Sequence, residues 1–341
     1  MKDRLLELND LSVSFYTEAG RVSAVEHVSF SLGPNETLGI VGESGCGKSV
    51  TSLSMLRLIP QPPGRIETGS ALFDGRDLLT MSEKDILEVR GNEISMIFQE
   101  PMTSLNPVFT VGYQISEVLR LHRGLGKEKA HQEAIRQLRR VGVPNPERVV
   151  NDFPFALSGG MRQRVMIAMA LACNPKLLIA DEPTTALDVT IQAQILMLMK
   201  QLQQEYHTAI MFITHDLGVI AEMSDRVLVM YAGQVMEEAP VAALFKDPLH
   251  PYTQGLLRSK PQNMSDQQRL YVIPGMVPNL LERPDGCQFH PRCPFADERC
   301  AHACPELFTL PDGRKSRCWR SEAADAESKN EGAKEGRRSR E

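Results

Sequence analysis

Residues 42–49 read G-E-S-G-C-G-K-S and match the pattern G-x-x-x-x-G-K-[ST]. An apolar run at 38–41 precedes the motif and predicts a buried strand, and a stretch compatible with a helix follows at 51–58. In this setting glycines allow backbone N–H groups to surround a phosphate, and the start of the helix adds a partial positive charge. The sequence therefore predicts a nucleotide-binding loop, whereas the motif alone would leave a glycine-rich turn with a chance lysine as the alternative.

Two residue types in this motif have defined roles when a nucleotide binds together with Mg²⁺. Lys48 is expected to bridge the β- and γ-phosphates, and Ser49 is expected to hold Mg²⁺. The residues predicted to contact the nucleotide here are Gly42, Ser44, Gly45, Cys46, Gly47, Lys48, Ser49 and Val50.

The composition limits what such a loop can serve. The chain has 341 residues, which suggests two or three domains, and 42% of them are hydrophobic, enough for a sizeable core. The formal net charge of −5 does not point to a nucleic-acid partner. No stretch reaches the length of about 18 apolar residues that a spanning helix needs, and the N-terminus lacks a signal-peptide pattern. We therefore expect a soluble, cytoplasmic chain that would rely on other chains to span a membrane.

Apolar runs and helical patterns alternate along most of the chain. Runs at 94–98, 177–180 and 209–213 predict strands, and helical patterns occupy much of 102–141 and 191–206. The last two runs are continuously apolar, as buried parallel strands are. The alternation predicts an α/β fold with a mostly parallel sheet, in which ligands bind beyond the carboxyl ends of the strands.

The character of the sequence changes near residue 250, where prolines become frequent and a group of cysteines follows. We expect a nucleotide-binding domain at 1–250, with a helical subdomain at about 102–165, and a small cysteine-rich extension at 251–320. Residues 321–341 carry many charges of both signs and no Val, Ile, Leu or Phe. Such a segment cannot bury enough apolar area to offset its ordering entropy, so we expect a disordered tail.

A second phosphate-binding pattern, L-S-G-G-M-R-Q, occupies residues 157–163 at the start of a helical stretch. Ser158, Gly159 and Gly160 would present backbone N–H groups at the N-terminus of that helix. Together with the first motif and the run L-L-I-A-D-E at 177–182, this ordered set resembles the ATP-binding subunits of ABC transporters, over roughly residues 5–320. The resemblance implies a P-loop ATPase fold that binds ATP and Mg²⁺.

The resemblance also implies catalytic roles for residues that follow predicted strands. It makes Glu182 the general base for the attacking water, and Asp181 a residue that holds Mg²⁺. Gln99 would contact Mg²⁺ and the water, and His215 would reach the γ-phosphate. Without the resemblance, an Asp-Glu pair is often an N-cap with a first-turn acid, and a lone histidine is more often a structural residue.

Further implied roles concern the adenine ring and a partner subunit. Phe15 matches an aromatic residue that stacks on adenine, with a plain edge-strand aromatic as the alternative. Asp188 belongs to the loop 186–188, which touches the opposite subunit. Because Ser158–Gly160 complete the site of the opposite subunit, the resemblance implies a head-to-tail dimer that closes on two ATP molecules. Met161 replaces a common glutamine, outside the groups that contact phosphate.

Longer segments resemble one branch of this family, the importers of dipeptides, oligopeptides and nickel. These segments are 97–107, 180–190, 250–253 and the cysteine region from residue 286. The resemblance is nearest to the D-type ATPase subunit and implies an energy-coupling subunit of a bacterial importer, peripheral at the cytoplasmic face of the inner membrane. The implied partners are a second related ATPase, two membrane permease subunits and an extracytoplasmic binding protein.

Two alternative functions stay open at this point. Nickel or another small solute could replace peptides as cargo, because the ATPase subunit does not contact the cargo. A non-transport ABC ATPase is an alternative of another class, although the chain has one phosphate loop and no long heptad run.

The C-terminal cysteines form a separate candidate site. Cys287, Cys293, Cys300 and Cys318 have the spacing C-x5-C-x6-C-x17-C when Cys304 is left out. They match positions at which some members of the family hold a four-iron four-sulfur (4Fe-4S) cluster, and soft thiolates favour iron–sulfur or zinc. Zinc with His290 as a ligand, and reduced cysteines without metal, are the alternatives. A metal here would supply folding energy that a short, proline-rich region lacks.

Overall fold

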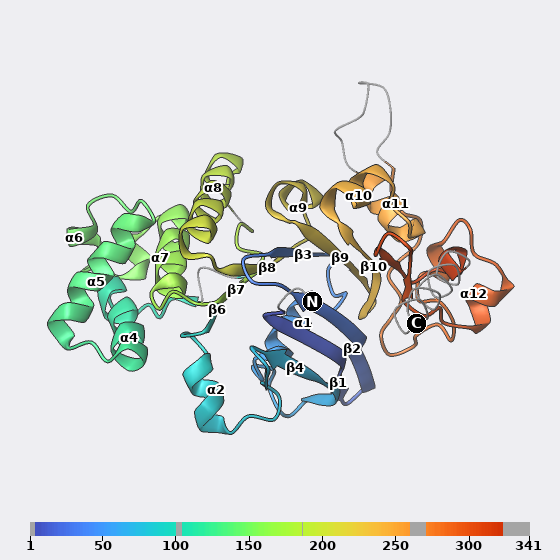
Figure 1. Cartoon of the computed structure of the whole chain (residues 1–341), viewed down its shortest axis with the longest axis horizontal. Helices are drawn as coiled ribbons and strands as arrows, with labels where there is room; N and C mark the ends of the chain where they lie inside the picture. Colours follow the sequence, from blue (N-terminus) through green and yellow to red (C-terminus); the bar gives the residue numbers. More distant parts are fainter. Residues whose placement is uncertain (1–3, 100–103, 186, 260–270, 323–341) are drawn as a thin grey trace, which may run out of the picture. The chain divides into compact units, whose positions relative to one another are not determined.

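The computed structural model describes residues 4–99, 104–185, 187–259 and 271–322. These residues form two compact units, and Figure 1 follows the chain through them by colour. Unit 1 comprises the described parts of Met1–Glu7, Ser31–Thr37 and Ala71–Thr214, and unit 2 those of Leu8–Phe30, Leu38–Ser70 and His215–Glu341. The predicted domain limits stay predictions, and the predicted tail lies outside the described residues from 323 onward.

Parallel strands form the sheet of unit 1. β7 (Leu177–Asp181) lies between β6 (Ile94–Ile97) and β8 (Ala209–Thr214) in the strand order. In this register Leu177 lies opposite both Ile94 and Ala209. Every residue of β7 and β8 is buried, as expected for parallel strands that are covered on both faces. The three apolar runs are therefore strands, as the sequence predicts.

Helices make up most of the rest of unit 1. They are α2 (Glu83–Val89), α4 (Val111–Arg123), α5 (Lys127–Arg140), α6 (Pro146–Val149), α7 (Gly159–Leu171) and α8 (Val189–Tyr206), with the 3-10 turn η1 (Pro154–Ala156). Buried residues recur every four positions in α4, at Val111, Ile115 and Leu119, so one face of this helix is buried. α4 and α5 pack against each other (Figure 1).

Unit 2 contains a sheet in which β2 (Gly20–Leu32), β1 (Leu6–Thr17) and β4 (Gly64–Phe73) lie in this order. Near its end β4 pairs with β5 (Arg76–Asp77), where Leu72 lies opposite Asp77 in an antiparallel register. Most of β1 and β2 belongs to unit 2, and only their first or last residues belong to unit 1.

A second sheet of unit 2 carries the phosphate loop. β3 (Thr37–Val41) pairs in parallel with β9 (Arg226–Tyr231), and β9 pairs antiparallel with β10 (Gln234–Pro240). The short strands β12 (Lys315–Ser316) and β11 (Phe308–Thr309) continue the sheet from β10. The pairings β6–β7, β7–β8 and β3–β9 are parallel, which confirms the predicted sheet, whereas the C-terminal strands add an antiparallel edge.

The C-terminal region shares a hydrophobic core with the strands of unit 2. The cluster joins Val41 of β3 and Tyr231 of β9 to Tyr252 and Phe289. The helices of this unit are α1 (Lys48–Met55), α9 (Leu217–Met223), α10 (Val241–Lys246), α11 (Pro251–Arg258) and α12 (Glu298–His302), with the turns η3 (His290–Arg292) and η4 (Trp319–Ser321). In the described residues, no helix combines the length and the apolar character needed to cross a bilayer.

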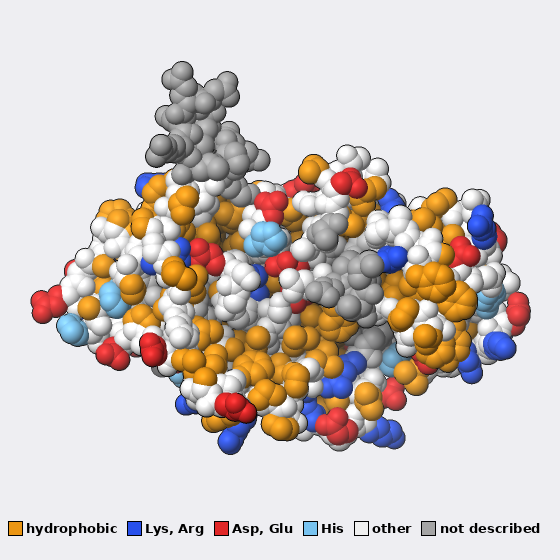
Figure 2. Space-filling view, turned by 180° about the vertical axis from the view of Figure 1, so that it is seen from behind, with side chains coloured by type: hydrophobic (Ala, Val, Ile, Leu, Met, Phe, Trp, Pro, Cys, Tyr) orange, Lys and Arg blue, Asp and Glu red, His pale blue; other side chains and the backbone are white. Residues whose placement is uncertain are grey.

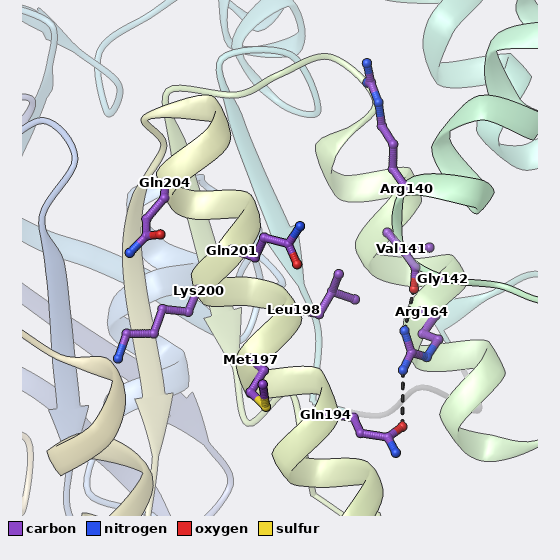
Figure 3. Close-up of a pocket in the computed structure, with 10 residues that line it drawn as sticks. All are labelled: Arg140, Val141, Gly142, Arg164, Gln194, Met197, Leu198, Lys200, Gln201 and Gln204. Atoms are coloured by element: carbon purple, nitrogen blue, oxygen red, sulfur yellow. Dashed lines mark hydrogen bonds between the residues drawn. The ribbon is translucent and has the colours of Figure 1, made fainter.

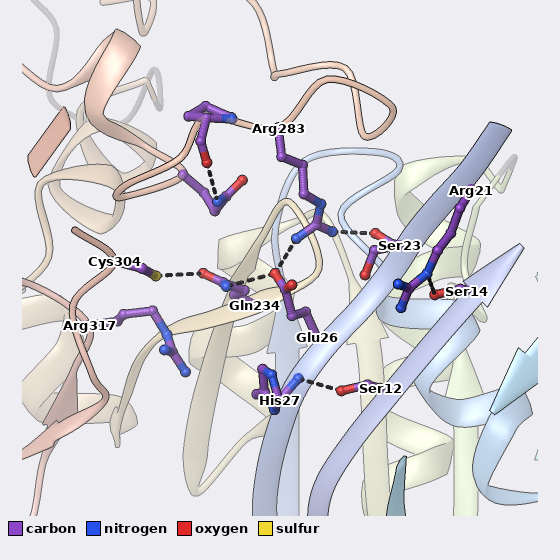
Figure 4. Close-up of polar contacts among 12 residues, drawn as sticks. Ser12, Ser14, Arg21, Ser23, Glu26, His27, Gln234, Arg283, Cys304 and Arg317 are labelled. Atoms are coloured by element: carbon purple, nitrogen blue, oxygen red, sulfur yellow. Dashed lines mark hydrogen bonds and ion pairs between the residues drawn. The ribbon is translucent and has the colours of Figure 1, made fainter. Parts of the chain in front are cut away.

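Polar contacts also join the C-terminal region to β2 (Figure 4). The guanidinium of Arg283 donates to the Glu26 carboxylate at 2.5 Å and to the carbonyl of Ser23. Gln234 of β10 donates to the same carboxylate at 3.0 Å. Glu26 therefore links three segments that are distant in the sequence, and these contacts add to the shared core of unit 2.

Candidate nucleotide-binding site

The predicted phosphate loop lies between β3 and α1, as its motif requires. Gly45 and Gly47 have φ angles of +78° and +99°, a region that only glycine adopts readily. A Cβ atom on Gly42 would lie 2.1 Å from the carbonyl oxygen of Met230, so no side chain fits there. Ser44 and Gly45 are exposed, whereas Cys46 is buried and burial raises the pKa of its thiol. The loop is therefore an open turn on a rigid base.

Lys48, the first residue of α1, lies against the loop itself. Its ammonium group donates to the carbonyl oxygens of Gly42 at 2.9 Å and Glu43 at 3.1 Å, and the residue is 6% exposed. The next residue, Ser49, is half-buried, and so is Val50. A folded loop with its lysine held against its own carbonyl oxygens has the form that a phosphate site needs.

The other two predicted residues of unit 2 lie on β1 and after β8. Phe15 is half-buried, and its ring lies close enough to Gly64 that a Cβ there would be 3.1 Å away. This position fits both an adenine platform and an edge-strand aromatic, so the role of Phe15 stays a prediction. His215 is exposed and directly precedes Asp216, the residue that caps α9 by accepting from Gly218 N at 2.7 Å.

In unit 1 the structure brings Gln99 and Glu182 together. The amide Nε2 of Gln99 donates to Glu182 Oε2 at 3.1 Å, and Thr185 Oγ1 donates to the same oxygen at 2.9 Å. Asp181, the last residue of β7, is 3% exposed. These groups therefore converge at the carboxyl ends of β6 and β7, as the parallel sheet predicts. Thr185 was not predicted as a site residue, although it lies three positions after Glu182.

The backbone at Glu182 is unusual. Its φ angle is +46°, which is uncommon for a residue with a side chain, and its N–H donates to Ile213 O of β8 at 2.9 Å. Strained backbone of this kind is frequent where a side chain must point in a fixed direction. The hydrogen bond to β8 therefore fixes the direction in which the chain leaves β7.

The second predicted phosphate-binding motif opens α7. Ser158 is the N-cap, and its Oγ accepts from Met161 N at 3.4 Å. Asp188 caps α8 in the same way, accepting from Ile191 N at 2.9 Å. Ser158 and Gly159 are exposed, so this helix start is open to a ligand from outside. The loop 186–188 is only partly testable, because residue 186 lies outside the described residues.

The four predicted cysteines lie around one cavity of unit 2. Cys287, Cys293, Cys300 and Cys318 line a space of about 30 Å³, together with aromatic residues and His290. Burial raises the pKa of all four thiols, that of Cys287 to about 12. Within the described parts of the chain, no group of three or more Cys, His, Asp or Glu residues converges as metal ligands do. The structure thus gathers the predicted set without forming a ligand shell.

The positions of His290 and Cys304 bear on which residues could be metal ligands. His290 Nδ1 lies 2.9 Å from the carbonyl oxygen of Cys287, so a proton on Nδ1 would leave Nε2 as the acceptor. Cys304 is exposed, and its thiol points toward Gln234 at 3.8 Å (Figure 4). Cys304 does not line the cavity of the other four.

A larger groove in unit 1 involves none of the predicted residues. It has a volume of about 570 Å³ and lies between the end of α5 and the helices α7 and α8 (Figure 3). Arg164 crosses it, donating to Val141 O at 2.5 Å and to Gln194 Oε1 at 3.3 Å. The arginine is held by these partners, so we assign no role to the groove.

Comparison with known proteins agrees with this arrangement. Residues 25–185 match the ABC transporter family, and residues 236–300 match the family described as oligopeptide/dipeptide transporter, C-terminal region. The chain is 53% identical over 323 residues to the oligopeptide transport ATP-binding protein AppD of Bacillus subtilis (strain 168), covering 95% of this chain and 98% of that protein. It is 52% identical over 314 residues to the dipeptide transport ATP-binding protein DppD of Escherichia coli (strain K12), covering 92% of this chain and 96% of that protein.

A solved structure has the same fold. The dimeric ATP-binding cassette MJ0796, in a post-hydrolysis state bound to ADP and Pi, is 27% identical to this chain with a TM-score of 0.62. The match covers 69% of this chain and 98% of that one. The chain therefore belongs to the ATP-binding subunits of ABC transporters. It is an ABC-type ATPase, and its C-terminal region is of the kind found in the oligopeptide and dipeptide transporters.

Proposed function

We propose that this chain is the energy-coupling ATPase subunit of an importer for dipeptides or oligopeptides. The observation that carries the proposal is the combination of an ABC cassette with a peptide-transporter C-terminal region in one chain. Its close relatives are described as oligopeptide and dipeptide transport ATP-binding proteins. Nickel or another small solute stays an alternative cargo. Peptide uptake by cells with and without the gene, with nickel uptake as the second assay, tests the assignment.

We propose that the residues indicated by the motifs bind the phosphates, the adenine ring and Mg²⁺. Gly42, Ser44–Val50 would cradle the phosphates, with Lys48 on the β- and γ-phosphates and Phe15 against the adenine. Ser49, Gln99 and Asp181 would hold Mg²⁺, which neutralises charge on the phosphates. The donor set fits this ion, because hydroxyl, amide and carboxylate oxygens are the ligands that Mg²⁺ prefers.

The proposed hydrolytic step depends on Glu182, Gln99 and His215. Glu182 would accept a proton from the attacking water, while Gln99 orients both the carboxylate and the water. Support comes from the contact between Gln99 Nε2 and Glu182 Oε2 and from the fixed backbone at Glu182. His215 would hold the γ-phosphate from its exposed position after β8. Replacement of each residue, with ATP binding and phosphate release measured separately, tests these roles.

The proposed working form is a head-to-tail pair with a second, related ATPase subunit. Ser158, Gly159, Gly160 and Asp188 would complete the partner's nucleotide site. The exposed start of α7 supports this, because the N-terminus of a helix attracts an anion and this one is open to the outside. The related cassette MJ0796 is described as dimeric. This chain with Glu182→Gln is coexpressed with the second subunit, and the mass of the pair is measured by light scattering. The pair should be a dimer with MgATP and should dissociate when ATP is removed.

Exposed apolar residues support membrane partners on the cytoplasmic side. Val108, Phe109 and Tyr113 are 70%, 41% and 45% exposed, and the two rings stack with centroids 4.6 Å apart. Hydrophobic side chains also gather in patches on the face drawn in Figure 2. We propose that residues 104–113 contact a permease subunit, with an extracytoplasmic protein delivering the cargo. Copurification with membrane subunits would support transport, whereas a stable complex with ribosomes or DNA would favour a non-transport ABC ATPase.

We propose that the cysteine cavity holds a thiolate-bound metal with a structural role, a 4Fe-4S cluster in first place and zinc in second. Four thiols around one cavity support this, although three or more ligands do not converge among the described residues. Iron, sulfide and zinc per chain should be measured after purification without oxygen. About four iron and four sulfide would establish the cluster, one zinc would favour a zinc site with His290, and no metal would reject both.

A further inference from the structure

Glu43, the second residue of the phosphate loop, is bound to the C-terminal region by both its backbone and its side chain. Its N–H donates to the hydroxyl oxygen of Tyr252 at 3.0 Å. Its carboxylate accepts two hydrogen bonds from Arg292, from Nη1 at 2.7 Å and from Nη2 at 3.1 Å. All three residues belong to unit 2, and the partners of Glu43 are 209 and 249 positions away in the sequence.

Arg292 is built into its place rather than lying on the surface. Its side chain is 5% exposed, and Nε donates to Pro274 O at 3.0 Å. Nη1 also donates to the hydroxyl of Tyr231 at 3.3 Å, and Nη2 to Ile273 O at 3.4 Å. A guanidinium has five N–H groups in a fixed fork, so this set of partners defines its orientation closely.

Aromatic packing holds Tyr252, which contacts Glu43, and Tyr231, which accepts a hydrogen bond from Arg292. The ring of Tyr231 lies 4.7 Å from that of Tyr252 and 5.3 Å from that of Phe289, measured between centroids. Tyr252 is fully buried, and burial raises the pKa of its phenol, so its hydroxyl stays neutral. Because these rings belong to the core that joins β9 to the C-terminal region, the support of Glu43 is as rigid as that core.

The contacts of Glu43 matter at the phosphate loop because the same residue holds Lys48. The carbonyl oxygen of Glu43 accepts from the Lys48 ammonium at 3.1 Å, and that of Gly42 accepts from the same ammonium at 2.9 Å. A shift of residue 43 would therefore move the lysine that is proposed to contact the phosphates. Ser44 and Gly45 are exposed, whereas Glu43 attaches the loop to the core on one side of them and Cys46, whose carbonyl accepts from Gly233 N at 3.0 Å, on the other.

We propose that Arg292 is a positioning residue of the nucleotide site, acting through Glu43, and that nucleotide binding is thereby linked to the C-terminal region. This rests on the proposed function of residues 42–50 as the phosphate loop. A linkage of this kind is reciprocal: if the region around Arg292 helps the loop to bind nucleotide, nucleotide must order that region to the same extent. An ion pair with only a structural role would contribute to the free energy of unfolding, but nucleotide binding would not change the order of the region around Arg292.

The first experiment measures binding of the non-hydrolysed analogue AMP-PNP with Mg²⁺ to the full chain, purified without oxygen. Arg292→Gln and Glu43→Gln should each weaken binding about tenfold, and the double variant should be weakened about tenfold rather than a hundredfold. Arg292→Lys, which keeps the charge but not the fork, should lie between the wild type and Arg292→Gln.

Arg314→Gln is the matched control. The Arg314 side chain is 13% exposed, against 5% for Arg292, and it is bound to two carboxylates, those of Asp247 at 3.2 Å and Asp312 at 2.6 Å, rather than to the loop. This variant should bind AMP-PNP within about twofold of the wild type. Thermal unfolding identifies any variant that fails to fold. If Arg292→Gln is such a variant, the AMP-PNP affinities of Arg292→Lys and Glu43→Gln test the proposal in its place.

The second experiment tests reciprocity by hydrogen exchange. AMP-PNP should slow exchange of amides in residues 271–275 and 286–293 of the wild type about tenfold, and should leave them unchanged in Glu43→Gln. Unchanged affinity in Arg292→Gln, additive effects in the double variant, or equal exchange with and without nucleotide would each overturn the proposal. Lys48→Ala tests the proposed phosphate loop separately from the proposed role of Arg292. If this variant binds AMP-PNP with wild-type affinity, residues 42–50 are not the nucleotide-binding loop, regardless of the results for Arg292.

Discussion

The two loops proposed to bind phosphate are held in different ways. The loop at 42–49 is tied to residues of β9, β10 and the C-terminal region, through Tyr252, Arg292 and the bond from Gly233 N to Cys46 O at 3.0 Å. The loop at 158–160 is held by its own helix, through the capping bond to Met161 N. The loop proposed to hold phosphate within this chain is thus attached to a core, whereas the loop proposed to complete a partner's site is left open. The first depends on tertiary structure and the second mainly on local sequence.

The largest expected effect separates binding from hydrolysis. Glu182→Gln should lower ATP turnover about a hundredfold or more, because an amide cannot accept the proton, while ATP affinity stays within about threefold. Phosphate release and binding of labelled ATP measure the two quantities. Thr185→Val, which removes one hydrogen bond to Glu182, serves as the milder control. Turnover near the wild-type rate in Glu182→Gln would remove Glu182 as the base.

A pair of alanine substitutions tests the comparison directly. Gly42→Ala would place a Cβ 2.1 Å from a backbone oxygen that cannot turn away, and should cost about 1–3 kcal/mol of unfolding free energy. Gly159→Ala would meet its nearest atom at 3.9 Å and should leave stability unchanged or slightly higher. Chemical denaturation of both variants measures the difference. Equal destabilisation would contradict the view that only the first loop is built into a core.

Acid should weaken the support of the first loop. His250 accepts from Tyr252 N at 3.0 Å through Nδ1, and its burial lowers the pKa of the imidazole to about 3. The unfolded chain binds a proton below about pH 6.5, so stability falls as the pH drops from about 6.5 toward 3, by at most about 1.4 kcal/mol per pH unit. Unfolding free energy measured against pH, compared between His250→Gln and a variant of the exposed His27, isolates this contribution. An unchanged slope in His250→Gln would exclude it.

The smallest expected effect concerns a single hydroxyl. Tyr252→Phe leaves the Glu43 N–H without its acceptor in a half-buried place, at a cost of about 1 kcal/mol, which corresponds to about a fivefold weaker nucleotide affinity if the loop loosens. Tyr16→Phe removes an exposed hydroxyl that contacts Glu67 and should change neither quantity. Titration calorimetry with AMP-PNP and thermal unfolding distinguish the two variants.

Much of the fold follows from patterns that act over short distances. Continuous apolar runs predict β6, β7 and β8, a strand–loop–helix motif predicts the loop before α1, and the motif at 157–163 predicts the start of α7. The contact of Gln99 with Glu182 also follows, because neighbouring parallel strands end at the same edge of a sheet. In contrast, β11 and β12 are two-residue strands with no periodicity of their own, so only their pairing with β10 defines them.

The sequence by itself therefore determined the class of protein, and it indicated the position of the loop at 42–49, the start of α7 and the acidic residues at the end of β7. The motifs behind these predictions each depend on residues within a few positions of one another, where backbone geometry and side-chain chemistry act locally. Only the tertiary structure placed Tyr252 and Arg292 on Glu43, across 209 and 249 positions. Contacts at that distance depend on how the core of unit 2 packs, because it brings together segments that no local pattern relates.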